Sequence, residues 1–312
     1  MVRVSHSMRL SLAILALLYG ADGGVAAAQD DPDDNSIVVR GMSEEEAERA
    51  VRDLSREVTR DRRFGEQMPR FQSPVCVLVY GLPRKNAVAL VARVRANAER
   101  VGLQVGEDGC EPNIVIGVVE DSEAAVSLLR EEKPWLFDSL REYEIERDLG
   151  AGRSARAWHV IEETLASGRE IDVGLDLEVG NSNPSETEAG TGAPISADTD
   201  YATRFRPPTQ AVIARGVVLL EYDAILGLQT EQVADYASMR MFASVDDAPI
   251  EGDEPLDTIL SLFSDPERAP AELTQFDLAY LQALYSTGRN AGDAALSRAA
   301  SRAYHRNVFE GE

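Results

Sequence analysis

Residues 75–119, VCVLVYGLPRKNAVALVARVRANAERVGLQVGEDGCEPNIVIGVV, decide the fold of this chain. The first six residues form a continuous apolar run that ends at Gly81-Leu82-Pro83, which is typical of a buried strand. Residues 85–101 follow with helical periodicity, and residues 113–119 (NIVIGVV) form a second apolar run. The pattern predicts a strand–helix–strand unit with two buried, parallel strands.

The two cysteines of the chain, Cys76 and Cys110, lie within this unit. Cys76 lies near the start of the first predicted strand, and Cys110 lies just before the second. Parallel neighbours bring those two starts to the same edge of a sheet, so we predict a disulfide between them. On the chain-entropy model such a bridge stabilises the fold by about 4 kcal/mol. The alternative is two separate buried thiols, which an oxidising compartment disfavours.

The segment before this unit predicts an amphipathic helix. Ser43 and Glu46 have the spacing of a capping box, which satisfies the first backbone N–H groups of a helix. Apolar residues follow at helical spacing and predict one narrow buried stripe, formed by Ala47, Val51, Leu54 and Val58.

The segment after the unit alternates helical and strand patterns. We predict helices over residues 122–132, 134–137, 230–245 and 273–285, the last with Thr274 as N-cap, and strands over 156–162, 171–179 and 211–222. Residues 180–200 have no such pattern and contain neither Lys nor Arg, which predicts a mobile acidic loop.

These elements predict a mixed α/β (α+β) fold, in which the strand–helix–strand unit is followed by a mixed sheet with packed helices. We expect a single domain over residues 42–290 that includes the mobile loop at 180–200. Residues 291–312 are predicted to form a polar tail that contributes little to the core.

Residues 1–28 have the three parts of a secretory signal. Two arginines precede a short apolar run at residues 10–18, and Ala26-Ala27-Ala28 supplies the small residues of a cleavage site. A membrane anchor needs about 20 apolar residues, so we predict cleavage after Ala28 and no transmembrane segment in the mature chain. Residues 29–41 are predicted to be a flexible acidic leader. The scarcity of lysine indicates a GC-rich bacterial genome, and the expected location is a Gram-negative periplasm.

The net charge of −23 bears on the expected partners. A chain this acidic is repelled by phosphate backbones, so nucleic acid is not an expected partner. Two clusters of carboxylates offer the oxygen ligands that calcium takes: Asp172, Asp176 and Glu178, and Asp246, Asp247, Glu251, Asp253 and Glu254. Neither has the spacing of an EF-hand, so we interpret them as a solvated acidic surface. A calcium-binding surface module is the alternative.

The motifs of common catalytic sites are missing from the sequence. It contains no HExxH, Walker A or G-x-S-x-G motif, and no Cys/His cluster at zinc spacing. His159 lies beside Trp158 in a predicted strand, so we interpret it as structural, and His305 lies in the predicted tail. Residues 150–155 match a relaxed GxGxxA pattern, but they follow a helix and not a strand, which predicts a turn. We expect no catalytic, cofactor-binding or metal-ligating residue, although a spatial Ser–His–acid triad stays open.

Four segments carry a resemblance to a known family: PVC at 74–76, GCEPN at 109–113, ADYASMR at 234–240 and LTQFDLAYLQALY at 273–285. They resemble a family of uncharacterised exported proteins from Gram-negative bacteria, and the resemblance spans residues 70–285. It implies a location and a fold, and no activity.

The C-terminal half also resembles exported zincin-like metalloprotease domains, in which a strand is followed by a helix with HExxH and by a closing LTxxD helix. The corresponding stretch here is residues 233–237, VADYA, which has neither the metal-binding histidines nor the glutamate base. The resemblance implies a degenerate zincin-like half that does not bind catalytic zinc in the usual way.

The expected function is therefore a non-catalytic periplasmic role, in which the protein binds a partner or supports the envelope. The alternatives are a hydrolase with an unrecognised or decayed zincin-like site, and the calcium-binding module. A flat surface with an exposed apolar patch favours binding. A cleft with converging polar groups and perturbed carboxylates favours a hydrolase.

Overall fold

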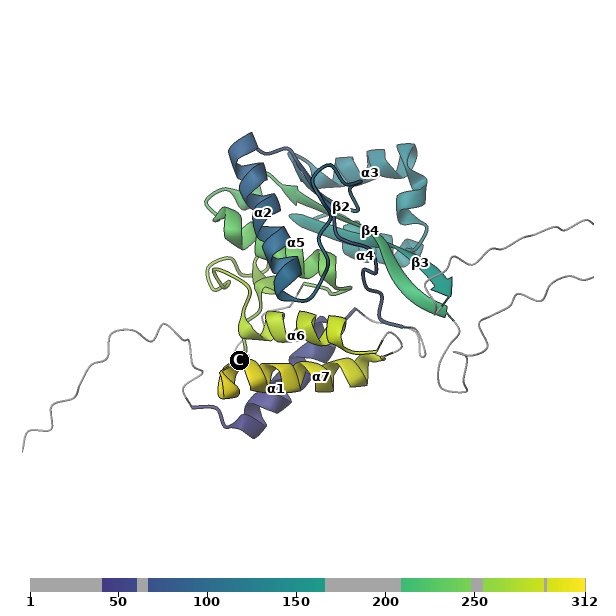
Figure 1. Ribbon diagram of the computed structural model, residues 1–312. Coiled ribbons are helices and arrows are strands. Elements are labelled where there is room, and N and C mark those ends of the chain that lie inside the picture. The colour runs from purple at the N-terminus through teal and green to yellow at the C-terminus, as the bar shows by residue number, and fades with distance from the viewer. Residues whose placement is uncertain (1–40, 61–66, 166–208, 248–254, 289–290, 312) are drawn as a thin grey trace, which may run out of the picture. The chain divides into compact units, whose positions relative to one another are not determined.

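The computed structural model describes residues 41–60, 67–165, 209–247, 255–288 and 291–311. The predicted signal at 1–28, most of the leader, the strand at 171–179 and the loop at 180–200 lie outside these residues. Within them the architecture is mixed α+β, as predicted (Figure 1).

A four-stranded mixed sheet forms the centre of the fold, with the strand order β1-β2-β4-β3. Its strands are β1 (Val77–Tyr80), β2 (Ile114–Val119), β3 (Ala155–Leu165) and β4 (Thr209–Glu221). β1 and β2 are parallel, with Val77 opposite Ile114, and β4 is parallel to β2 on its other side. β3 runs antiparallel to β4. The predicted parallel pair is therefore confirmed, and β1 and β3 are the two edges of the sheet that the described residues form.

Helices α2 (Arg84–Arg100) and α5 (Thr230–Phe242) pack together on one face of the sheet (Figure 1). α2 connects β1 to β2 and buries Leu90, Val94 and Ala98 in the main core. Every residue of α5 from Val233 onward is buried, because further helices cover its outer side. The helices on this side are α1 (Glu44–Val58), α6 (Gln275–Ser286) and α7 (Asp293–His305), of which α6 contacts α5. The short turns η2 (Asp223–Ile225) and η3 (Ile259–Ser261) connect elements, and η4 (Arg306–Glu310) follows α7.

Both predicted helix starts are confirmed. Ser43 and Glu46 form the capping box of α1, and its predicted stripe is buried. The side chain of Thr274 accepts the N–H of Asp277 and caps α6.

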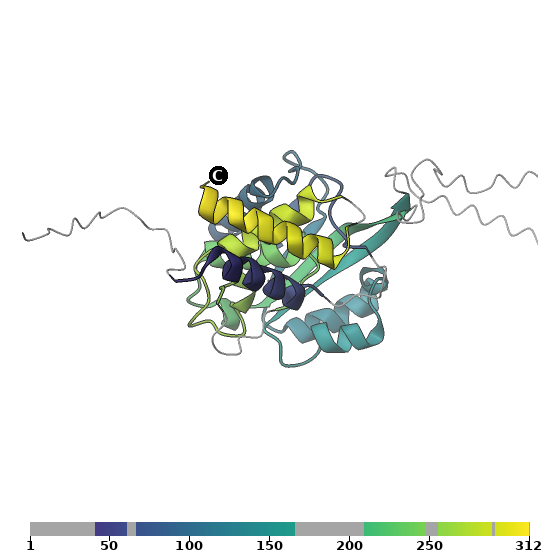
Figure 2. The same cartoon turned by 90° about the horizontal axis from the view of Figure 1, so that it is seen from below.

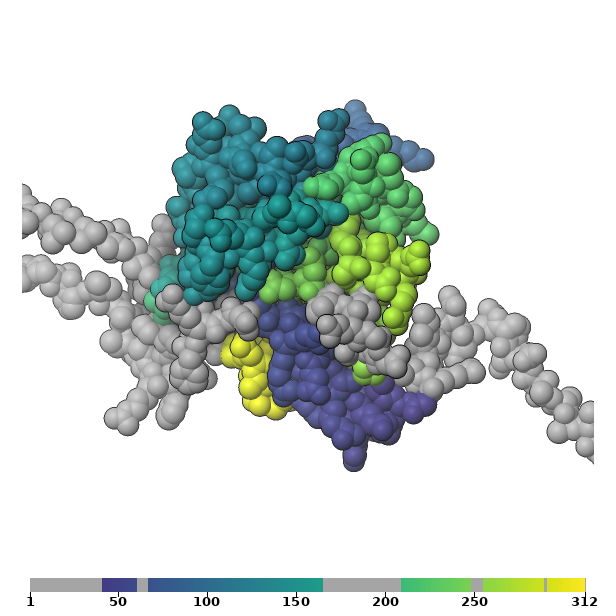
Figure 3. Space-filling view, turned by 180° about the vertical axis from the view of Figure 1, so that it is seen from behind, coloured from purple at the N-terminus to yellow at the C-terminus, as the bar shows by residue number. Residues whose placement is uncertain are grey.

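The opposite face of the sheet has a smaller core of its own. Helices α3 (Ser122–Glu132) and α4 (Glu142–Leu149), with the 3₁₀ turn η1 (Pro134–Phe137) between them, cover β3 and β4 there. Trp158 is fully buried, stacks on Phe137 with ring centroids 5.2 Å apart, and donates its indole N–H to the carbonyl of Leu136 at 3.0 Å. Seen from behind, the teal residues that include these helices cover the upper part of the molecule above α1 (Figure 3).

The prediction of a polar tail over residues 291–312 is wrong. Residues 293–305 form α7, which lies beside α1 and α6 (Figure 2). Leu296, Ala300 and Ala303 are buried in this contact. Alanines are too small to mark a segment as core in the sequence, but they let α7 approach its neighbours closely.

The prediction that the first strand is buried is also wrong in part. The side chains of β1 are alternately half-buried and exposed, and Leu78 and Tyr80 are 46% and 41% exposed. β1 lies at an edge of the sheet, and the helices on the second face pack over β3 and β4. Among the described residues, no element covers one side of β1 or its outer edge along the strand.

The predicted disulfide between Cys76 and Cys110 is present, with Cα atoms 6.0 Å apart. It lies at the start of β1, where the backbone is held from both sides. Ile114 donates its N–H to the carbonyl of Cys76, and Val75 pairs with the segment around Val105. The bridge therefore fixes the point at which β1 enters the sheet.

Candidate binding groove between strand β1 and helix α2

The open edge of β1 follows from how its backbone groups alternate. Val75 donates its N–H to the carbonyl of Gln104 and accepts the N–H of Gly106, both on the side away from β2. The carbonyl of Cys76 points the other way, toward the N–H groups of Asn113 and Ile114. With this alternation, Val77 and Val79 direct their N–H and C=O groups to the outer edge. The edge is closed before β1 begins and is open along the strand itself.

Helix α2 lies above this edge and has two apolar stripes. One stripe faces the core, as described above. The second consists of Val88, Val91 and small residues, and Val88 is 61% exposed. An amphipathic surface helix ordinarily directs a polar face to solvent, so the second stripe needs another explanation.

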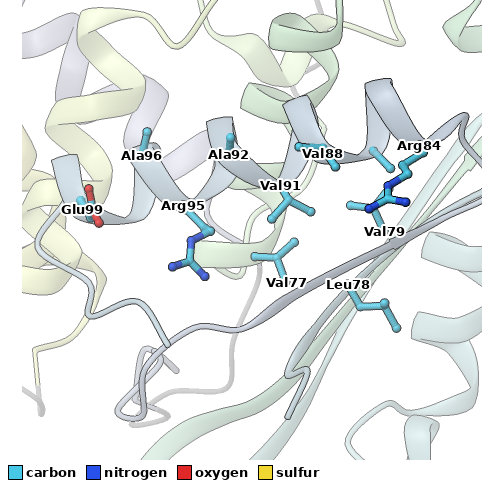
Figure 4. A pocket seen from close by; sticks show the side chains of 11 residues that line it. Val77, Leu78, Val79, Arg84, Val88, Val91, Ala92, Arg95, Ala96 and Glu99 are labelled. Carbon is cyan, nitrogen blue, oxygen red and sulfur yellow. The ribbon is translucent and has the colours of Figure 1, made fainter. Parts of the chain in front are cut away.

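A cavity of about 580 Å³ lies between the second stripe of α2 and β1. We call it the β1–α2 groove. Val77 and Val91 point toward one another across its floor (Figure 4). The groove is lined by Val77, Leu78, Val79, Arg84, Ala87, Val88, Val91, Ala92, Arg95, Ala96 and Glu99.

Two arginines lie at separate points along this apolar groove. Arg84 begins α2 and lies above Val79, while Arg95 hangs from the helix toward the strand, beyond Val77 (Figure 4). Neither forms an ion pair with a residue in the described ranges. By contrast, Arg93 on the same helix donates to the carboxylate of Asp235 at 2.7 Å. The groove therefore carries two arginines without an ion pair to a described residue, together with one carboxylate, Glu99.

The roof of the groove is held by a buried network between α2 and α5. Asp235 is fully buried and accepts four hydrogen bonds: two from Arg93, one from Asn97 at 2.6 Å and one from the backbone N–H of Leu273 at 2.9 Å. Hydrogen bonding to Asp235 raises the pKa of Arg93 further above its usual value. These contacts fix the position of α2 before any partner binds.

Two glycines shape the C-terminal end of β1. Gly81 has φ +83°, and a Cβ there would lie 1.9 Å from the carbonyl oxygen of Val118, so the chain can turn into α2 only with glycine. Gly117 on β2 leaves room for the ring of Tyr80, whose hydroxyl oxygen would be 2.3 Å from an added Cβ. The ring of Tyr80 therefore packs over β2, on the face of the sheet opposite the groove.

The histidines singled out in the sequence lie outside the groove. His159 is buried in the main core, where its Nε2 is 3.0 Å from the carbonyl oxygen of Met241. His305 ends α7, and its contact with Glu44, together with the charge of Glu310, raises its pKa. The two rings are on different elements, β3 and α7.

The acidic loop cluster is described only in part. Asp246 pairs with Arg60 at 3.0 Å, and Asp247 pairs with Arg240 and accepts the hydroxyl of Tyr236 at 2.6 Å. The other carboxylates of the two predicted clusters lie outside the described residues. Within those residues, no group of three or more Asp, Glu, His or Cys side chains is arranged to hold a metal ion.

The stretch that corresponds to the HExxH of zincins, residues 233–237, lies in α5 and is wholly buried. Its one carboxylate, Asp235, is saturated by the donors named above. Residues 150–155 form the predicted turn before β3. The β1–α2 groove itself was not predicted, although the exposed-face valine and alanines of residues 87–96 are visible in the sequence.

No helix in the described part of the chain has the length and apolar character needed to span a membrane. No protein-family model, curated protein or solved structure matches this chain.

Proposed function

We propose that this chain is a non-catalytic, exported protein that binds a partner protein in the β1–α2 groove. The observation that carries the proposal is the second apolar stripe of α2, which faces an unpaired strand edge and has no covering element among the described residues. Exposed apolar surface of this kind marks interaction sites in soluble proteins.

The chemistry of the groove supports binding over hydrolysis. Its walls are valines and alanines, and its charged side chains are Arg84, Arg95 and Glu99. The carboxyl with a markedly raised pKa, Asp277 at about 6, is buried elsewhere, at the start of α6. It accepts hydrogen bonds from Thr258 and from two backbone N–H groups. Its oxygens are therefore used within the core and do not line the groove.

Export to the periplasm is the location we propose for this function. The signal-like pattern of residues 1–28 supports it, and the disulfide between Cys76 and Cys110 is of the kind that persists in oxidising compartments. Cell fractionation of the source bacterium, with the two cysteines assayed for oxidation, tests the location directly.

Photo-crosslinking in living cells tests the binding site. p-Benzoylphenylalanine replaces Val88 in the groove or, as a matched control of nearly equal exposure, Leu226 beyond η2. We expect a crosslinked adduct of discrete mass from Val88 and none from Leu226. Equal adducts from both positions, or none from Val88, would contradict the proposal.

A further inference from the structure

We infer that the partner of the β1–α2 groove is an extended, acidic segment of another protein, which adds to the sheet as a fifth strand beside β1. This inference rests on the proposed function and specifies its ligand. Three independent features of the described residues point to it: the backbone of the open edge, the shape of the apolar groove and the position of its two arginines.

The backbone of β1 offers hydrogen bonds that only an extended chain can use together. Val77 and Val79 present their N–H and C=O groups outward at the spacing of a strand. Just before them, Val75 already bonds in this way with Gln104 and Gly106, on the same outer side. An added strand would continue the line that this segment begins. Strand addition to an open sheet edge is an established mode of peptide recognition.

The groove provides sites for alternate side chains of such a strand. Side chains that point toward α2 would enter the space between Val77 and the second apolar stripe, where Val88 and Val91 lie. Side chains that point the other way would lie beside Leu78 and Tyr80, which are exposed on the opposite face. The small lining residues of α2 leave room for apolar side chains of the size of valine.

The arginines determine the charge of the segment. Arg84 and Arg95 are eleven positions apart on α2, which is about 16 Å along a helix axis and about five residues of extended chain. The favoured segment therefore has apolar residues in its middle and an acidic residue toward each end. In a chain with net charge −23, two cations without an ion pair to any described residue are a local attraction for carboxylates.

The same charges disfavour a second copy of this chain at the edge. If two β1 strands paired, Arg84 and Arg95 of one copy would lie beside those of the other, and Glu99 is the one carboxylate in the lining of each groove. Like charges brought together in this way oppose association. We therefore assign the edge to a different, acidic protein.

Binding of three synthetic peptides to the full mature protein tests the inference. The first, TETVTVTET, places two glutamates and two valines on one face of a strand. The second, TKTVTVTKT, reverses its charges. The third, TETPPVTET, keeps the charges, but its two prolines break the hydrogen-bonding pattern of a strand. We expect the first peptide to bind at least about tenfold more tightly than either of the others at low salt.

Charge reversal in the protein provides the matched comparison. R84E/R95E should lose the acidic peptide and gain the lysine peptide, whereas R100E, which changes an exposed arginine of α2 outside the groove, should keep the preference of the wild type. Hydrogen exchange should show new protection of the amides of Val77 and Val79 with the acidic peptide. Thermal melting of both variants shows that they are folded.

Three results would overturn the inference. Equal binding of the acidic and lysine peptides would remove the charge argument, and equal binding of the proline peptide would remove strand addition. A dimer that forms at the titration concentrations and is protected at Val77 and Val79 would assign the edge to a second copy. If no peptide binds but Val88 still crosslinks in cells, the groove is a binding site for a ligand of another kind. Loss of that crosslink is instead the failure of the proposed function.

Discussion

Replacing Asp235 with asparagine tests whether the position of helix α2 depends on a buried carboxylate. The two oxygens of Asp235 accept only N–H donors: Oδ1 from the Nε of Arg93 and from Asn97, and Oδ2 from Nη2 of Arg93 and from the backbone of Leu273. An asparagine side chain has a single acceptor oxygen. Whichever way it is turned, its NH₂ group faces two donors.

Asp235→Asn should lower the free energy of unfolding because it breaks these contacts. A buried N–H left without an acceptor costs about 1–3 kcal/mol, and the loss of a hydrogen bond to a charged group costs about 1.5–3 kcal/mol. Arg93 is 26% exposed and recovers part of its loss from water. We therefore expect the free energy of unfolding to fall by about 3–4 kcal/mol, near the range for a broken buried ion pair.

Urea unfolding followed by tryptophan fluorescence measures this difference, with Glu272→Gln as the matched control. Glu272 contacts the same Arg93 at 3.1 Å, but its side chain is 68% exposed, so we expect a change below about 0.5 kcal/mol. The reasoning is refuted if Asp235→Asn costs no more than the control. If Asp235→Asn instead stabilises the protein, the carboxylate is kept at a cost to stability, as functional groups are, and the zincin-like interpretation regains support.

Two further predictions concern stability away from the groove. The double variant Cys76→Ala/Cys110→Ala should lower the free energy of unfolding by about 3–4 kcal/mol. Thiol labelling of the denatured, unreduced wild type should modify neither cysteine. Two labelled cysteines would show that the bridge does not form in the cell. Asp277 should make stability depend on pH, because burial raises its pKa from 3.8 to about 6 against the hydrogen bonds that lower it. Since the folded state holds this proton more tightly than the unfolded chain does, the contribution is present below about pH 4 and is lost as the pH rises through about 6. The free energy of unfolding of the wild type, relative to that of Asp277→Asn, should therefore fall by about 2 kcal/mol from pH 4 to pH 7. A relative stability that rises over this range would mean that the hydrogen bonds lower the pKa of Asp277 more than burial raises it.

The features that could be predicted from the sequence are those with local causes. The predicted capping box of α1 and the predicted N-cap Thr274 of α6 each depend on residues three positions apart, and both are present. The disulfide follows from a strand–helix–strand unit whose two starts lie at one edge. In each case the deciding contacts join residues that are close in sequence or joined by one connection.

The burial of α7 has no comparable local cause. Its core side chains are one leucine, one tyrosine and several alanines, and the hydrophobicity of alanine is too low to mark a buried face. Ser301, which accepts a hydrogen bond from Arg52 of α1, is buried as well. The segment belongs to the core because α1 and α6 offer a surface close enough for small residues, and that surface is assembled from the two ends of the chain.

The groove was missed for a related reason, and the reason strengthens the case for a partner. The apolar run of β1 predicts a buried strand because all its residues are apolar. The structure instead extends the sheet from β2 through β4, so that β1 is left at the edge. Edge strands are usually protected by lysine, proline, a bulge or a covering element. β1, with the sequence VLVY, has no lysine or proline and pairs with β2 in unbroken register. β1 therefore has the composition of a strand from the interior of a sheet, although it lies at an edge. The groove beside it carries two arginines without an ion pair to a described residue. These are the properties we expect of a strand whose second neighbour is supplied by another protein.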